Sequence, residues 1–361
     1  IKKKIFEPQM LLNLFTKRSV SSDFLIRKSS NFLDLCFQWV RANIFIPDSR
    51  CFWIKPSIRF LDNYITENKI DIVISTGPPH SMHMIGLALK KKHNIKWIAD
   101  FRDPWTEIEY FDNLPLLPIV LNKHKKLEKD VFLTADLIIS VSNFWADRFR
   151  MSGAKNVFVL TNGYDSEDYE ESNPKTPCSE FQIGHFGLYN KLRDYSFFWN
   201  TIIKLNNNLV GFESNLKLFF AGEVHADFFN NLKSKKLFQK LDYYDYLDHK
   251  DAIKNMMKCD LLLVTQGDTK LALGRLPAKV FEYLRSRRPI LAIGKKNSDL
   301  EKLISNISYA WFVDFDNEHL LYQTIIEIYN LRISPKSFRD DISLFSRENQ
   351  AKELINIINN L

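Results

Sequence analysis

The chain has 361 residues, of which 45% are hydrophobic and 26% are charged, so it can bury substantial cores and does not have a disordered composition. Its length predicts two domains. The cysteines are far apart and form no CxxC pair, which excludes a recognisable zinc knuckle or dithiol redox motif and is typical of reduced thiols in a cytoplasmic protein; they are Cys36, Cys51, Cys178 and Cys259.

The formal net charge of +7 is concentrated near the N-terminus. Residues 1–60 hold eleven Lys and Arg against four Asp and Glu, a balance of 11 − 4 = +7, which leaves 39 of each sign in the rest. This excess predicts a solvated basic face or attraction to an anionic membrane surface. We expect no nucleic-acid partner, because no RRM, helix-turn-helix or zinc-finger pattern is present.

The chain shows no signal peptide and no apolar run near the ~20 residues of a spanning helix, so we expect a cytoplasmic protein, peripheral at most at the inner face of the cell membrane. It begins at Ile1 rather than Met. Residues 1–56 lack a glycine-rich turn after a first strand. The first domain therefore either lacks its opening strand and loop or uses a different edge.

Helical and strand patterns alternate from residue 57 on, which is typical of parallel sheets covered by helices. Residues 1–165 are predicted to form the first domain. The expected helices cover 58–68, 81–93, 119–134 and a short run that ends at Phe149. The expected strands cover 71–75, 95–99, 136–142 and 157–160.

An acidic stretch with two prolines, residues 166–180, predicts a linker to the second domain, residues 181–335. Expected strands cover 181–188, 216–222, 243–247, 260–265, 289–294 and 310–313, and expected helices cover 194–206, 226–237 and 277–286. Residues 336–361 predict a C-terminal helical segment. The fold class is α/β, with two Rossmann-like doubly wound domains that face a cleft.

Ligands of parallel sheets bind beyond the carboxyl ends of the strands, so polar residues there are candidate site residues. The stretch "STGPPHS" puts His80 at a helix start, where backbone N–H groups favour an anion. The stretch "ADFRDPW" delivers Asp100, Arg102 and Asp103 at the end of a buried strand. We predict catalytic roles for these four residues. The alternatives are a structural ion pair for the three charges and a simple helix cap for His80.

The segment "FGLYNKLRD" follows the first strand of the second domain. Gly187 leaves room for close approach of a ligand, and Lys191 and Arg193 are in reach of a phosphate. These three residues predict part of a phosphate-binding site.

The segment "GRLPAKVFE" predicts a helix that starts at Pro277, with Arg275 just before it and Lys279 in its first turn. Glu282 follows on the same face. Cations at a helix N-terminus suit a diphosphate, and a carboxylate one turn deeper suits sugar hydroxyls, so the pattern predicts a nucleotide-sugar site without a metal. The alternative is that Lys279 and Glu282 form an exposed i, i+3 pair.

Five segments, in order and at compatible spacing, together resemble a bacterial GT-B glycosyltransferase of the family 4 type, the retaining group that uses nucleotide-sugar donors. The resemblance covers roughly residues 57–330. The segments are "DIVISTGPPHSMHMIGLALKKKHNIKWIADFRDPWT", "ADLIISVS", "NVFVLTNGYD", "FGLYNKLRD" and "LPAKVFEYLRSRRPILAIG".

The resemblance implies transfer of a sugar, with retention, from a nucleotide-sugar donor to a glycan or lipid-linked acceptor in cell-surface polysaccharide biosynthesis. It implies no further cofactor. In the family's Glu-x7-Glu signature Glu282 matches the second Glu, but the position eight residues earlier is Gly274. The strand end that often carries a His in the family reads "ADFRDPW" here.

Two other functions stay open from the sequence: a nucleotide-sugar epimerase or hydrolase of the same fold, and a non-catalytic sugar-nucleotide-binding subunit. The lysine-rich run 125–129 is interpreted as a solvated helix face. Trp39 and Trp53 are interpreted as packing residues rather than as an acceptor platform. The donor sugar, its base and the acceptor do not follow from the sequence.

Overall fold

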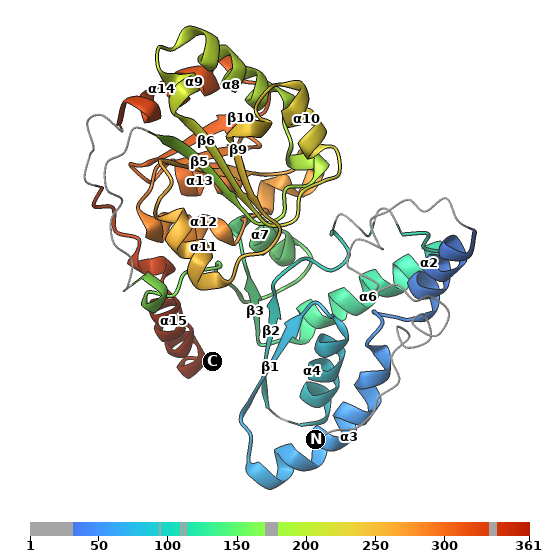
Figure 1. Ribbon diagram of the computed structural model, residues 1–361. Coiled ribbons are helices and arrows are strands. Elements are labelled where there is room, and N and C mark those ends of the chain that lie inside the picture. Colours follow the sequence, from blue (N-terminus) through green and yellow to red (C-terminus); the bar gives the residue numbers. More distant parts are fainter. Residues whose placement is uncertain (1–31, 94, 109–110, 112–113, 170–179, 332–337) are drawn as a thin grey trace. The chain divides into compact units, whose positions relative to one another are not determined.

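Figure 1 shows the computed structural model of the chain, which describes residues 32–93, 95–108, 111, 114–169, 180–331 and 338–361. The contacts within the chain divide it into two compact units. The first comprises Ile1–Leu160 with Asn360–Leu361, and the second comprises Thr161–Asn359. The division therefore falls before the predicted boundary at residue 165.

The predicted linker is only partly described. Glu167–Tyr169 form a 3-10 helix, and the buried Tyr169 donates a hydrogen bond to the Glu282 carbonyl over 2.8 Å. Residues 166–169 therefore pack on the second unit, whereas 170–179 lie outside the described residues.

The first unit contains a four-stranded parallel sheet in the order β1-β2-β3-β4. Its strands are β1 (Ile72–Gly77), β2 (Lys96–Phe101), β3 (Leu137–Ser140) and β4 (Val157–Val159). Its helices are α2 (Phe32–Ile44), α3 (Cys51–Asn68), α4 (Ser81–Lys92), α6 (Pro118–Thr134) and α7 (Asn143–Met151). All four predicted strands are present.

Two differences from the sequence prediction concern the ends of elements. The helix predicted from residue 58 begins at Cys51 and continues through Pro56, and α2 was not predicted. Strand β2 extends to Phe101, so Asp100 lies within the strand, paired in register with Thr76 of β1. The predicted end at residue 99 was too early because a charged residue interrupted the apolar run.

Helix α4 packs directly on the sheet because Gly86 lets its backbone approach Trp97. A Cβ atom at Gly86 would collide with the indole of Trp97, which is fully buried. Trp97 Nε1 donates to Ser75 Oγ over 2.9 Å, and Ser75 Oγ lies 2.9 Å from His83 Nδ1. These contacts tie β1, β2 and α4 together beneath the strand ends of the first unit.

The second unit contains a six-stranded parallel sheet in the order β10-β9-β8-β5-β6-β7 (Figure 1). The strands are β5 (Phe181–Phe186), β6 (Leu216–Ala221), β7 (Leu241–Tyr244), β8 (Leu261–Thr265), β9 (Ile290–Gly294) and β10 (Ala310–Asp314). The chain leaves β5 toward β6 and later returns to the other side of β5 through β8. This reversal is the topological switch point at which doubly wound sheets bind ligands.

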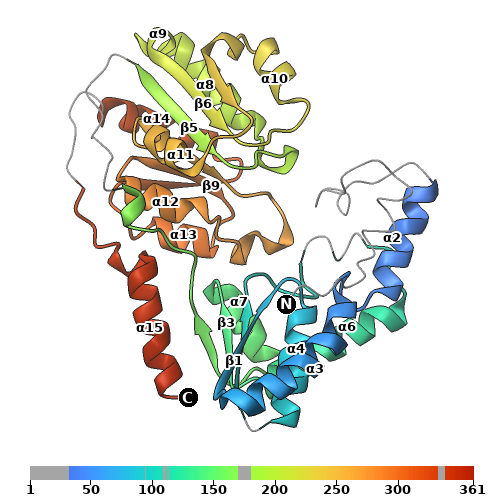
Figure 2. The same ribbon diagram turned by 60° about the horizontal axis from the view of Figure 1, so that its bottom comes forward.

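Helices pack on both faces of this sheet (Figure 2). They are α8 (Ser196–Asn208), α9 (Phe212–Asn215), α10 (Phe228–Ser234), α11 (His249–Met256), α12 (Lys279–Ser286), α13 (Asp299–Ile304) and α14 (Glu318–Leu331). The C-terminal helix α15 (Arg347–Asn359) extends away from the sheet (Figure 2). Short 3-10 helices cover Lys191–Arg193, Phe238–Lys240, Lys270–Gly274 and Ser343–Phe345. Helices α9, α11, α13 and α14 were missed in the sequence, and in the predicted C-terminal helical segment 336–361 the α-helix begins only at Arg347.

Two hydrophobic clusters sandwich the sheet, and the central strand β8 is apolar from Leu261 to Val264, so it contributes to both. Leu261 and Leu263 of β8 belong to one cluster, whereas Leu262 and Val264 belong to the other. Successive side chains of a strand point to opposite faces, so a continuous apolar run is what a strand covered on both faces requires. The "DLLLVT" run predicted this burial.

The segment after Leu160 is fixed to the C-terminal part of the second unit. Tyr164 N donates to Phe345 O over 3.0 Å, and Gln350 Nε2 donates to Thr161 O, also over 3.0 Å. A Cβ atom at Gly163 would collide with Phe345 O, so the backbones approach too closely for a side chain. Gly163 is therefore a point of close backbone packing between this segment and Phe345.

We predict that Gly86→Ala lowers the free energy of unfolding by about 1–3 kcal/mol, because the added methyl group overpacks the contact with Trp97. An alanine in a helix interior otherwise stabilises by up to about 1 kcal/mol relative to glycine, so the sign separates the two effects. Urea unfolding measures the change, with Lys91→Ala on the exposed side of α4 as the control. A stabilised Gly86→Ala variant would contradict the close packing.

Candidate functional site

The strand ends of the first unit bring Thr76 and Asp100 together. Thr76 Oγ1 donates to Asp100 Oδ2 over 2.7 Å across the β1–β2 pair. Burial raises the pKa of the Asp100 carboxyl, and the Thr76 hydrogen bond and the nearby Arg102 guanidinium oppose this shift. The result is a half-buried carboxylate with a fixed orientation at the carboxyl end of a parallel strand, where substrates bind in such sheets.

Arg102 and Asp103 lie just beyond the strand and are exposed. The Arg102 guanidinium donates to the Pro78 carbonyl, and Arg102 N donates to Gly77 O over 3.0 Å. Arg102 therefore joins the loop after β1 to the loop after β2. The structure brings the predicted residues Asp100, Arg102 and Asp103 to one edge of the sheet.

His80, the fourth catalytic candidate, lies in the interior with only 3% of its surface exposed. Its ring stacks on Trp105 with a centroid distance of 4.8 Å and an interplanar angle of 1°. The ring would have to move to reach a substrate. His80 occupies the N-cap position of α4, but it is Asp48 Oδ2 that accepts the hydrogen bond from Ser81 N, over 2.7 Å.

His80 belongs to a buried group with His83 and His124. Burial lowers the pKa of His83 to about 3 and that of His124 to about 4, and it lowers the pKa of His80 well below its ordinary value. Trp105 Nε1 donates to His124 Nδ1 over 3.2 Å. All three rings are therefore neutral at neutral pH.

In the second unit two glycines meet at the ends of β5 and β6. Gly187 and Gly222 have φ angles of +119° and +123°, and a Cβ atom at Gly222 would lie 2.5 Å from Gly187 O. Gly187 N donates to Ala221 O over 2.7 Å. Only glycine suits both the left-handed backbone and this close approach. We call this pair the glycine junction.

The glycine junction lies beside the start of α12. A Cβ atom at Gly187 would lie 4.0 Å from Lys279 Cγ, so the first residue of α12 lines the loop after β5. Lys279 Nζ lies 2.7 Å from Glu282 Oε2. The i, i+3 pair foreseen as an alternative is thus present, and both side chains remain accessible, at 34% and 18% exposure.

Helix α12 begins at Lys279 and not at Pro277, with Ala278 at the N-cap. The prediction was wrong by two residues because Pro277 starts a separate turn, in which Val280 N donates to Pro277 O over 3.0 Å. Lys279 therefore occupies the first helical position. Its backbone N–H belongs to the first turn, whose donors have no partner within the helix.

The other predicted phosphate ligands lie on two neighbouring loops. Lys191 and Arg193 lie in a 3-10 helix after β5, where Lys191 is exposed and Arg193 Nη1 donates to Leu188 O over 2.8 Å. Arg275 lies at the end of the loop after β8 and is half-buried. The fold thus places these three cations beyond the ends of β5 and β8, on either side of the switch point.

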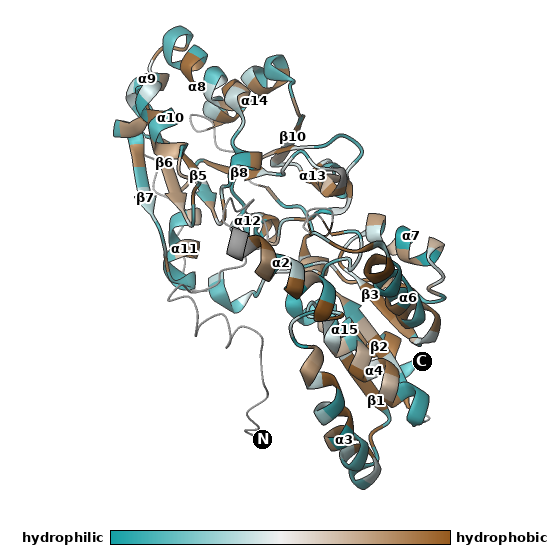
Figure 3. Cartoon of the chain, turned by 90° about the vertical axis from the view of Figure 1, so that its right-hand side faces the viewer, coloured by the Kyte–Doolittle hydropathy of each residue, from teal (hydrophilic) through white to brown (hydrophobic). Residues whose placement is uncertain are grey.

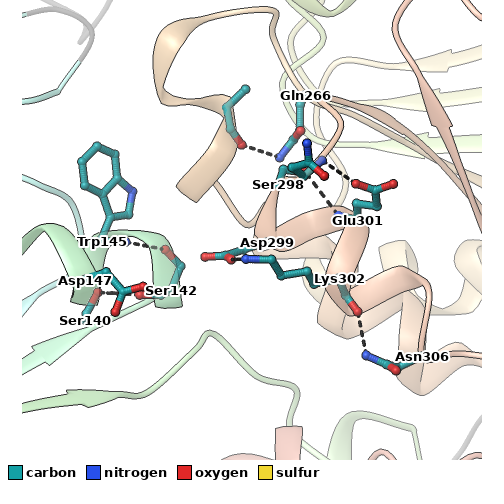
Figure 4. Close-up of polar contacts among 12 residues, drawn as sticks. Ser140, Ser142, Trp145, Asp147, Gln266, Ser298, Asp299, Glu301, Lys302 and Asn306 are labelled. Carbon is teal, nitrogen blue, oxygen red and sulfur yellow. Dashed lines mark hydrogen bonds and ion pairs between the residues drawn. The ribbon is translucent and has the colours of Figure 1, made fainter.

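The buried Gln266 fixes the loop after β8, a role that the sequence did not reveal (Figure 4). Its Nε2 donates to Ala272 O over 3.0 Å and to Arg275 O over 2.6 Å, and its Oε1 accepts from Lys295 N over 3.1 Å. Gly222 was also missed, although a glycine at the end of a predicted strand is a signal for close backbone approach.

The two loops that form the glycine junction are also joined through Asp194. Its carboxylate lies 2.8 Å from His225 Nε2 and accepts from Trp199 Nε1 over 2.5 Å. In addition, Tyr189 N donates to Glu223 O over 2.8 Å. Among the described residues, no group of three or more His, Cys, Asp or Glu side chains is placed to hold a metal ion.

Two parallel α/β units with these strand-end sites define a GT-B fold, as predicted from the sequence, and the comparisons agree with this class. Residues 14–168 match the model of Glycosyltransferase Family 4, which confirms the resemblance over the N-terminal part of the chain. The search of curated proteins found no match.

Three solved structures illustrate the fold similarity. The sucrose-phosphate synthase of Thermosynechococcus elongatus is 12% identical, with a TM-score of 0.59 over 88% of this chain and 80% of that one. A mutant of S. aureus TarM in complex with Fondaparinux, alpha-GlcNAc-glycerol and UDP is 14% identical, with a TM-score of 0.57; the match covers 86% of this chain but only 58% of TarM. A putative UDP-N-acetylglucosamine 2-epimerase of Listeria monocytogenes is 12% identical, with a TM-score of 0.53 over 87% of this chain and 81% of that one.

We predict that the buried histidines make the protein less stable in acid. An unfolded histidine binds a proton below about pH 6.5, whereas His83 and His124 in the folded state do so only near the lowered pKa values of about 3 and about 4. Between pH 7.5 and 5.5 each histidine should therefore remove about 1.4 kcal/mol of unfolding free energy. Glu128, whose pKa burial raises, acts in the opposite direction.

Urea unfolding at both pH values tests this prediction in the parent and in His83→Asn. The variant should lose less stability between the two pH values than the parent, whatever its stability at pH 7.5. An equal pH dependence in the two proteins would show that His83 is not held neutral.

Proposed function

We propose that the protein transfers a sugar from a nucleotide-sugar donor to a hydroxyl group of a glycan or lipid-linked acceptor, in cell-surface polysaccharide biosynthesis. The family match and the GT-B fold support a glycosyltransferase. The observation that carries the choice of donor is the glycine junction, which lies beside Lys279 at the N-terminus of α12. Such a place offers backbone donors, a helix dipole and a cation to a diphosphate.

The second unit supplies the groups that this donor needs. In the proposal Lys191, Arg193, Arg275 and Lys279 bind the diphosphate, and Glu282 accepts hydrogen bonds from the ribose. The Lys279–Glu282 pair then exchanges its mutual contact for contacts with the donor. The TarM structure, a complex that includes UDP, supports a nucleotide at a fold of this kind.

The first unit is proposed to act at the reacting sugar. The bond between the anomeric carbon and the diphosphate oxygen breaks, a bond from that carbon to the acceptor oxygen forms, and the acceptor proton passes to the departing phosphate, with retention at the carbon. Asp100, oriented by Thr76, accepts a hydrogen bond from a sugar hydroxyl. Arg102 and Asp103 complete the polar edge. Fixed charges of this kind stabilise the charge that develops on the leaving group.

A nucleotide-sugar epimerase is the second candidate, and the fold similarity to the Listeria enzyme favours it. A binding subunit without activity is the third. Incubation with UDP-, GDP- and ADP-sugars, with and without acceptors, separates the three. A transferase makes a glycoside only when an acceptor is present, an epimerase converts the donor alone, and a binding subunit does neither but is stabilised by about 2.7 kcal/mol at 100 times its dissociation constant.

We predict that Glu282→Ala weakens nucleotide binding by about 100-fold. Two charge-assisted hydrogen bonds of ~1.5 kcal/mol each would be lost, and each 1.4 kcal/mol is a factor of ten. Calorimetric titration with the nucleoside diphosphate measures the change, with Glu353→Ala on the exposed side of α15 as the control. Binding as tight as that of the parent would refute the assignment of α12 to the nucleotide.

We predict that Asp100→Asn lowers kcat by about 100-fold while the melting temperature changes little, because Thr76 can donate to an amide oxygen as well as to a carboxylate. The control is Asp71→Asn, which alters an exposed carboxylate just before β1. Steady-state kinetics and thermal unfolding are measured together. A large loss of stability with transfer preserved would favour a structural role for Asp100.

A further inference from the structure

Large apolar side chains are exposed at one end of the first unit. Trp39 and Ile44 of α2 are 43% and 60% exposed, and Phe52 near the start of α3 is 47% exposed. Leu117, just before α6, and Ile119 within it are 42% and 75% exposed. We call these five residues the apolar end. Figure 3 shows hydrophobic segments on α2 and α3 among more hydrophilic ones.

Specific contacts bring the five residues into one region. Asn43 Nδ2 donates to Pro115 O and Asn43 Oδ1 accepts from Leu117 N, both over 2.8 Å, which fixes the end of α2 to the start of α6. Phe45 packs edge-to-face on Phe52 at a centroid distance of 5.8 Å, which joins the end of α2 to α3. Figures 1 and 2 both show α2 beside the start of α6.

The charges around the apolar end are mostly positive. In the described ranges 35–64 and 114–128, which include Phe60 and Tyr64 of α3, there are seven cations and three carboxylates. The carboxylates all have partners: Asp48 accepts from Ser81 N and Ser81 Oγ, Asp62 pairs with Lys92 and His93, and the buried Glu128 accepts from Thr106 N. The cations are Arg41, Arg50, Lys55, Arg59, Lys123, Lys125 and Lys126.

This combination matches an anionic bilayer surface better than another polyanion. A nucleic acid would also attract cations and stack on aromatic rings, but Ile44, Leu117 and Ile119 offer it no ring to stack on. In a lipid interface the same aliphatic side chains gain by leaving water, the tryptophan prefers the headgroup level, and the lysines pair with phosphates. Helix α3 extends the aromatic surface with Phe60 and Tyr64, whose rings stack at 6.1 Å.

We propose that the apolar end inserts into the headgroup region of an anionic phospholipid bilayer while the surrounding lysines and arginines bind its surface. The attachment is peripheral, since no helix among the described residues is long and apolar enough to cross a membrane. It concerns a surface remote in sequence from the nucleotide-site residues, so it stands independently of the proposed sugar transfer.

Sedimentation with vesicles tests the proposal on the full chain. The parent should bind phosphatidylglycerol-containing vesicles at low salt, bind pure phosphatidylcholine vesicles far more weakly, and lose affinity steeply as salt rises. Replacing Lys123, Lys125 and Lys126 together by Gln should weaken binding on the order of 100-fold. Replacing Ile44 and Ile119 together by Ser should weaken it about 10-fold or more and leave the salt dependence unchanged.

Matched variants on other surfaces control for charge and hydrophobicity. Lys250, Lys254 and Lys258, replaced together by Gln, remove the same charge from the α11 region, and Met151 and Val210, replaced together by Ser, remove exposed apolar side chains elsewhere. Both controls should bind vesicles as the parent does.

Three results would overturn the proposal: no vesicle binding at low salt, equal losses in test and control variants, or concentration-dependent dimerisation that the Ile44/Ile119 substitutions abolish without changing vesicle binding. A fluorophore on the exposed Cys36 of α2, with the other cysteines replaced by Ser, reports on insertion directly. Its emission should shift to the blue on vesicles, and an unshifted emission in the bound state would place the contact elsewhere.

Discussion

The close approach of two backbones at Gly187 and Gly222 is the constraint on which the candidate donor site depends. Parallel pairing of β5 and β6 brings the two strand ends side by side, and the absence of side chains lets the loops touch. The hydrogen bonds around Asp194 and between Tyr189 and Glu223 hold the loops in that position. The switch point lies between β5 and β8, and Lys279 at the start of α12 lies beside the loop after β5 whose path these two glycines allow.

In the first unit the polar edge of the sheet depends on a partly buried carboxylate rather than on glycines. Trp97, Ile98 and Ala99 of its strand β2 are fully buried, and the chain then places the half-buried carboxylate of Asp100 near the end of the strand. Thr76 opposes the cost of burying this carboxylate with a hydrogen bond, whereas burial keeps His80 and His83 in the neutral form. The polar side chains near the strand ends of the first unit are thus of two kinds, the oriented carboxylate of Asp100 and the neutral rings of the buried histidines.

Sequence patterns predicted the strands well because most of the buried strands are largely apolar runs, as in "DLLLVT" and "IKWIAD". They pointed to the loops after β5 and β8 as candidate site segments because glycine, proline and basic residues follow those strands. They missed α13 because its six residues are too short for a helical period, and they placed His80 in a substrate site because spacing alone does not reveal the Trp105 ring that covers it. The fixing role of Gln266 depends on carbonyl groups supplied by the folded loop.

That glutamine has a consequence for how such a chain can diverge. Its single amide holds backbone atoms of Ala272, Arg275 and Lys295, and none of these bonds involves a side chain of the loop. The path of the loop from Ala272 to Arg275 therefore depends on the side chain of Gln266, the first residue after β8. Substitution of the exposed Asp268 leaves these three bonds in place, whereas the fully buried Ala272 has no room for a larger side chain, so the loop can diverge at its exposed positions while its path is inherited.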